Sequence, residues 1–320
     1  MKKVGMPRGL YYYDYYLLWE AYFNSLNMEV VSSIKTNKDI LDLGIASCVD
    51  EACLPVKIYH GHVAYLKDKV DCIFIPKYIR LHKKEYNCPK HLGIVDMLNS
   101  SIENLPPLIT PKIELNNKAD FKNIMYSVGR EFKKSNKEIK NAYKYARKTF
   151  SKQDDWIQKM VIPDYNKKEL KKGRIKLLIL GHSYNVYDDF LNMGLIKKLY
   201  NKGVDIATVN DINENEYRLY SYNKNKRIFW TQGRKIIGTA YSLIEGHKVD
   251  GIIYISAFGC GLDSVLIYPI EKKSHDYNIP FMTITFDEHT GEAGIDTRIE
   301  AFLDMMKWRS ESENYLPSFR

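Results

Sequence analysis

The chain has 320 residues, of which 45% are hydrophobic, and it carries a formal net charge of +9. That length allows two domains with separate cores, and the composition excludes a disordered chain. No stretch approaches the roughly 18 uninterrupted apolar residues of a membrane span, and the chain begins directly with a strand-like segment, so we expect a cytoplasmic protein. The five cysteines are scattered and do not resemble a secreted disulfide framework, so we expect reduced thiols.

Much of the excess positive charge is lysine between Lys133 and Lys176. Basic surfaces attract nucleic acid, but the chain has no zinc-finger spacing and no aromatic RNA-binding motif. The lysines alternate with Glu, Asp and Asn, so we interpret the segment as a solvated helix surface and expect no nucleic-acid partner. Attraction of a phosphate-bearing ligand, such as a coenzyme A moiety, is an alternative.

The first 117 residues alternate short apolar runs with segments of helical period, which is typical of a parallel α/β domain. We expect strands at Lys2–Met6, Glu29–Ser33 and Val70–Ile75, and helices at Tyr11–Leu26, Asn37–Ser47 and Pro55–Leu66. Asn37 is the expected N-cap of the second helix.

Residues 118–172 are lysine-rich, nearly free of glycine and helical in period, which predicts a helical connector. A second α/β domain follows at 173–309, and 310–320 read as a frayed polar tail. The expected elements of the second domain are strands at Ile175–Leu180, Val204–Val209, Gly251–Phe258 and Pro280–Phe286, and helices at Asp188–Asn201, Gln232–Gly246, Asp263–Tyr277 and Thr297–Met306. Thr297 and Glu300 suggest a capping box for the last helix. The predicted fold is therefore α/β, with two Rossmann-like parallel-sheet domains.

Three cysteines stand at turns beside proline or glycine, where a helix can begin: Cys53, Cys88 and Cys260. A helix N-terminus lowers the pKa of a thiol, so the metal-binding thiolate becomes accessible. Gly259 and Gly261 would let the backbone approach a bulky ligand closely. In parallel α/β folds ligands bind beyond the carboxyl ends of strands, so we expect the three thiols to reach one cleft between the domains.

The alternative for each of these thiols separately is a small buried hydrophobe. We expect that role for Cys72, inside a strand, and for Cys48, on the apolar face of a helix. Three thiolates without a histidine favour iron–sulfur over catalytic zinc, and Cys-Pro also ends the bacterial ferredoxin cysteine run. Structural zinc remains a third alternative.

Glu288, His289 and Glu292 form an acid–base cluster on a glycine-containing loop, with His289 the best candidate for proton transfer. A satisfied turn network would explain the same residues. His182 and Ser183 follow a strand and could contact a substrate or cap the loop.

Several longer motifs resemble the acyl-CoA dehydratase activase-related family, which is akin to 2-hydroxyacyl-CoA dehydratase subunits and double-cubane cluster proteins. The resemblance spans the chain from Gly5–Arg8 to Glu300–Leu303. The motifs that carry it are Val49–Lys57, Gly61–Val63, Tyr86–Lys90, Phe258–Asp263 and Asp287–Gly294.

The resemblance implies an iron–sulfur cluster, 4Fe–4S or a share in a larger one, held by Cys53, Cys88 and Cys260 between two Rossmann-like domains. It implies low-potential electrons from a separate ATP-hydrolysing activase with its own 4Fe–4S cluster, since this chain has no activase-type phosphate loop. The expected activity is reduction or dehydration of a small substrate, with a CoA thioester as one candidate, in a homo- or heterodimer. The alternative is a non-catalytic cluster-bearing scaffold or partner.

Overall fold

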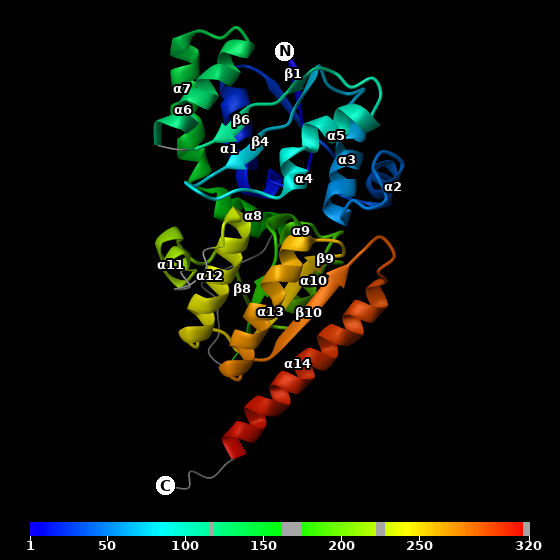
Figure 1. The fold of residues 1–320 in the computed structure, drawn as a ribbon, viewed down its shortest axis with the longest axis vertical. Coiled ribbons are helices and arrows are strands. Elements are labelled where there is room, and N and C mark those ends of the chain that lie inside the picture. The colour runs from blue at the N-terminus through cyan, green and yellow to red at the C-terminus, as the bar shows by residue number, and fades with distance from the viewer. Residues whose placement is uncertain (116–117, 162–173, 222–227, 316–320) are drawn as a thin grey trace. The chain divides into compact units, whose positions relative to one another are not determined.

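The computed structural model describes residues 1–115, 118–161, 174–221 and 228–315, and the chain divides into two compact units (Figure 1). The first unit comprises Met1–Pro163 with Ile228–Gly233, and the second comprises Asp164–Arg227 with Arg234–Arg320. Each unit contains its own parallel sheet.

The first unit is built on a four-stranded parallel sheet in the order β2-β1-β3-β5. Its strands are β1 (Lys3–Met6), β2 (Glu29–Ser32), β3 (Cys72–Phe74) and β5 (Leu108–Ile109), and a separate parallel pair joins β4 (Lys77–Arg80) to β6 (Lys112–Glu114). The helices between them are α1 (Tyr12–Ser25), α2 (Lys38–Ala46), α3 (Leu54–Leu66), α4 (Pro89–Leu92) and α5 (Ile94–Ser101). As expected, the Asn37 side chain caps α2 by accepting a hydrogen bond from the Ile40 N–H at 3.0 Å.

Three further helices, α6 (Lys118–Glu131), α7 (Asn136–Phe150) and α8 (Gln153–Val161), also belong to the first unit. Helices α6 and α7 share one hydrophobic core with α1, in which Trp19 and Tyr22 lie with Met125 and Ala142. The buried Gln153 side chain ties α8 to α1 by donating to the Tyr13 carbonyl at 2.8 Å. The expected domain boundaries at 117 and 172 lie outside the described residues.

The second unit is built on a four-stranded parallel sheet in the order β10-β9-β7-β8. The strands are β7 (Lys176–Leu180), β8 (Asp205–Thr208), β9 (Gly251–Ala257) and β10 (Phe281–Phe286). The helices are α9 (Ser183–Tyr187), α10 (Leu195–Asn201), α11 (Glu214–Tyr220), α12 (Thr231–Glu245), α13 (Gly261–Asp276) and α14 (Glu292–Tyr315), and the first turn of α12 counts with the first unit. Two parallel sheets with helical crossovers confirm the predicted α/β class with two Rossmann-like domains.

The prediction of a helix at Asp188–Asn201 is wrong for residues 188–194. The Asp188 carboxylate accepts hydrogen bonds from the N–H groups of Phe190 and Leu191, and Met193 and Gly194 both have positive φ. Side-chain capping and left-handed backbone interrupt the helix there, so regular helix begins only with α10.

The last helix is also longer than expected, since α14 starts at Glu292 and reaches Tyr315. Thr297 therefore lies inside it and donates to the Ala293 carbonyl at 3.1 Å, so the expected Thr297–Glu300 capping box is wrong. The expected polar tail is helical through Tyr315, and residues 316–320 lie outside the described part of the chain.

Helices α2 and α3 cross at two glycines that face each other's backbone. A Cβ on Gly61 would lie 1.9 Å from the Ile40 carbonyl oxygen, and a Cβ on Gly44 would lie 2.1 Å from the Lys57 carbonyl oxygen. Both distances are far inside van der Waals contact, so only glycine allows this helix pair.

We predict that Gly61→Ala lowers the free energy of unfolding by about 1–3 kcal/mol or more, because the two helices must separate to admit the methyl group. Helix propensity alone would give the opposite sign, by up to about 1 kcal/mol. Urea denaturation of the full chain measures the difference. Gly294→Ala in α14 is the matched control, since no atom lies within 4 Å of its Cβ position. A Gly61→Ala variant as stable as Gly294→Ala would contradict the close packing.

His62 on α3 is fully buried, and its Nε2 lies 3.1 Å from the Thr36 hydroxyl. Desolvation by burial, with the positive charge of Arg8 as a second cause, lowers the pKa of His62 from its ordinary value to about 3. The unfolded chain therefore takes up a proton in a pH range where the folded chain does not.

We predict that His62 makes the folded state lose stability as the pH falls from about 6.5 toward about 3, by at most about 1.4 kcal/mol per pH unit. His62→Gln should reduce this slope, whatever its stability at neutral pH. Urea midpoints at several pH values across this range test it, with His275→Gln at an exposed position as the control. An unchanged slope in His62→Gln would show that His62 is protonated in the folded chain.

Candidate functional site

Three of the cysteines stand at helix N-termini, as expected from the sequence. Cys53 is the N-cap of α3, Cys88 is the N-cap of α4, and Cys260 is the N-cap of α13. The side chains of Cys88 and Cys260 make no capping hydrogen bond. Proline stands in the first turn of α3 and of α4, where its missing N–H is not needed.

The loop that carries Cys88 is anchored through Asn87. The Asn87 side chain is buried, accepts a hydrogen bond from the Tyr11 hydroxyl and donates one to the Tyr78 carbonyl. Lys90 donates to the Glu51 carbonyl at 3.1 Å and so ties the Cys88 turn to the turn before Cys53. The first unit therefore holds both cysteine turns in fixed positions.

The pKa of the Cys53 thiol is raised, because desolvation by burial outweighs the lowering effects of Lys90 and of the Val56 N–H. The expectation of a lowered thiol pKa at this helix N-terminus is therefore wrong for Cys53. A smaller contribution in the same direction comes from Cys88, so the two thiols lie within electrostatic range of each other.

Cys48 and Cys72 lie in other surroundings. Cys72 is fully buried in β3, as expected. Cys48 is half-buried in the bend that follows α2, so its expected place on the apolar face of that helix is wrong. Burial raises the pKa of both thiols.

In the second unit, Cys260 follows β9 through a turn that requires glycine. Gly259 has a φ of +75°, which disfavours any residue with a Cβ. No atom lies within 4 Å of the Cβ position of Gly259 or of Gly261. The backbone on either side of the Cys260 thiol therefore leaves room for a bulky group.

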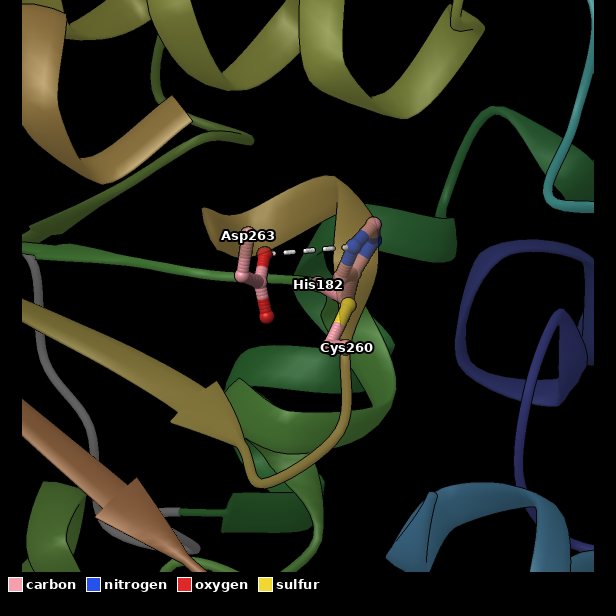
Figure 2. A group of neighbouring side chains, drawn as sticks. All are labelled: His182, Cys260 and Asp263. Atoms are coloured by element: carbon pink, nitrogen blue, oxygen red, sulfur yellow. Dashed lines mark ion pairs between the residues drawn. The ribbon is translucent and has the colours of Figure 1, made fainter. Parts of the chain in front are cut away.

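His182 and Asp263 lie beside Cys260 (Figure 2). One ligand atom from each of the three side chains lies within 4.8 Å of the other two, and no other such group of three or more His, Cys, Asp or Glu side chains occurs among the described residues. His182 Nε2 is 3.4 Å from Asp263 Oδ1. Strands β7 and β9 are parallel neighbours, so His182 after β7 and Cys260 after β9 share one edge of the sheet.

The Asp263 carboxylate is completely buried and is held by two hydroxyl groups. Tyr254 donates to its Oδ1 at 2.8 Å, and Ser256 donates to its Oδ2 at 3.1 Å. Burial, and next the negative charge of Asp263, raise the pKa of Tyr254 well above its usual range. Tyr254 therefore stays protonated and keeps its hydrogen bond to the carboxylate.

The expected acid–base residues Glu288, His289 and Glu292 are not brought together as a group of converging ligand atoms. His289 is exposed, and its backbone N–H donates to Asp287 Oδ1 at 2.9 Å. Glu292 is exposed at the start of α14 and forms an ion pair with Lys198 at 2.6 Å.

Asp263 and Tyr254 were not predicted as site residues. Asp263 is the third residue after Cys260, a position where an acidic residue commonly stabilises the first turn of a helix. The sequence therefore gives no sign that its carboxylate is buried beside the thiol.

The first unit also contains an aromatic cavity of about 40 Å³, lined by Tyr11, Tyr15 and His91 among others.

No helix in the described ranges is both long enough and apolar enough to cross a membrane.

No curated protein matches the chain. Among solved structures, the chain is similar to a ligand-free aspartate transcarbamoylase from Trypanosoma cruzi, with 8% identity and a TM-score of 0.20, over 91% of this chain and 72% of that one. A likeness this weak carries no argument.

Two family models match the chain and confirm the resemblance found in its motifs. Residues 205–306 match the family described as 2-hydroxyglutaryl-CoA dehydratase, D-component. Residues 3–212 match the family described as CoA enzyme activase uncharacterised domain (DUF2229). Since the second match covers more than half of the chain, the protein belongs to the CoA enzyme activase uncharacterised domain family and is related to the 2-hydroxyglutaryl-CoA dehydratase D-component.

Proposed function

We propose that the chain binds an iron–sulfur cluster through Cys53, Cys88 and Cys260 and transfers low-potential electrons to a small substrate. The observation that carries the proposal is that each of these thiols is the N-cap of a helix, in a chain that belongs to this family. Bound to three thiolates, such a cluster keeps one iron without a cysteine ligand and supplies one-electron chemistry there.

The residues present fit such a group. Thiolates are the preferred ligands of iron–sulfur clusters, and the backbone N–H groups of a helix start stabilise negative charge on sulfur. The glycines around Cys260 leave open space on its loop. Burial disfavours a free thiolate at Cys53, but a bonded metal ion compensates that charge and displaces the proton.

A separate ATP-hydrolysing activase with its own 4Fe–4S cluster is the proposed electron donor, by relation to the activase and dehydratase families. The proposed substrate is a small molecule, with a CoA thioester as one candidate, and the proposed assembly is a homo- or heterodimer. His289 is the proposed proton-transfer residue, with Glu288 and Glu292 as its neighbours.

A second candidate function is a cluster-bearing scaffold that docks an activase without turning over a substrate. The observation that favours it is the state of the acid–base loop, since His289 is exposed and Glu292 is held in an ion pair with Lys198. Reduction of a substrate in the presence of an activase and ATP would exclude the scaffold.

We predict that changing Cys53, Cys88 or Cys260 singly to serine removes most of the bound iron, because each supplies a cluster ligand. The measurement is iron and sulfide content after anaerobic reconstitution, with the thiolate–iron absorbance at about 400 nm. Cys72→Ala and Cys48→Ala are the controls, which should keep their iron, with a loss of packing stability on the order of 1 kcal/mol for Cys72→Ala. A colourless wild-type protein, or equal iron loss in all five variants, would require the assignment to be withdrawn.

A further inference from the structure

The ligand atoms of His182, Cys260 and Asp263 are close to the spacing of a mononuclear metal site. Bond lengths of about 2.0–2.3 Å place the ligands of a tetrahedral ion about 3.3–3.8 Å apart. His182 Nε2 and Asp263 Oδ1 are already 3.4 Å apart, and all three ligand atoms lie within 4.8 Å of one another. Small side-chain rotations would therefore bring them around one ion.

His182 is a buried polar side chain whose hydrogen bonding is unfulfilled. It is 3% exposed, and neither ring nitrogen has a hydrogen-bond partner in the described part of the chain, although Nε2 lies 3.4 Å from Asp263 Oδ1. Stacking on Tyr184, with ring centroids 5.0 Å apart, fixes the plane of the imidazole. An unpaired buried nitrogen is costly, and a metal bond would remove that cost.

The backbone conformation at Gly181 places His182 beside the Cys260 turn. Gly181 has a φ of +147°, and a Cβ there would lie 2.6 Å from the Ile255 carbonyl oxygen. Only glycine lets the loop after β7 pass this close to β9, and that approach puts His182 beside the Cys260 turn.

Asp263 supplies a negative charge that no lysine or arginine of the described residues offsets. Its carboxylate is fully buried, its hydroxyl donors Tyr254 and Ser256 are neutral, and among the described residues no lysine or arginine pairs with it. A buried carboxylate is stabilised by a cation in contact with it.

We propose that His182, Cys260 and Asp263 bind one divalent transition-metal ion of the Fe²⁺ or Zn²⁺ class within the second unit alone. Nitrogen, sulfur and oxygen donors together favour such borderline ions over Mg²⁺ or Ca²⁺. Three protein ligands leave one coordination position open. The site shares Cys260 with the proposed cluster, so the single ion would bind only when the cluster is absent. It needs neither Cys53 nor Cys88.

The test uses Co²⁺ as the probe and the full chain carrying Cys53→Ser and Cys88→Ser, stripped of metal and kept anaerobic. We expect one equivalent of Co²⁺ to bind with a thiolate-to-cobalt charge-transfer band. Adding Cys260→Ser should abolish the band, and adding His182→Gln or His182→Ala should weaken Co²⁺ binding by about 10-fold or more. His275→Ala, at an exposed position of the same unit, is the matched control and should bind as the double variant does.

Circular dichroism of the metal-free variants separates loss of folding from loss of binding, and His182→Gln keeps a polar side chain if His182→Ala fails to fold. Absence of the band, or a band of equal affinity without His182, would overturn the single-ion site. A band seen in the wild type but not in the double variant would also overturn it, while leaving the cluster proposal intact. Failure of wild-type iron–sulfide reconstitution alongside intact Co²⁺ binding would instead remove only the cluster.

Discussion

The unpaired N–H groups at the start of a helix are the constraint on which the candidate site depends. Helices α3, α4 and α13 each begin at a cysteine, so each sulfur stands where the backbone favours negative charge. In the second unit the parallel strand order adds a second condition, because β7 and β9 end side by side and present His182 next to Cys260. The helix N-termini and the strand order together decide which side chains could coordinate a metal.

Local signals explain why much of this could be predicted from the sequence. Proline after Cys53 and Cys88, and glycine on both sides of Cys260, indicate helix starts within a few residues. Alternating apolar runs and helical periods were enough to predict two parallel sheets. The family motifs are likewise contiguous, and both family matches confirm them.

What the sequence did not reveal depends on contacts between distant residues. His182 and Asp263 are far apart in the chain and meet only because β7 and β9 are neighbours. The raised pKa of Cys53 follows from burial, which its local pattern of turn and proline does not show. The start of α14 was misjudged because Thr297 and Glu300 fit a capping box, whereas the Asp287–Thr290 turn, closed by side-chain hydrogen bonds, lets the helix begin earlier.

The buried carboxylate of Asp263 has a consequence for electron affinity. It is shielded from water, and the two hydroxyl groups that hold it fix its position without neutralising it. Each electron added to a metal bound at Cys260 would increase the repulsion from this nearby charge, and low local polarity strengthens that repulsion. Asp263 would thus shift the reduction potential of such a metal to more negative values and make its reduced form a stronger donor.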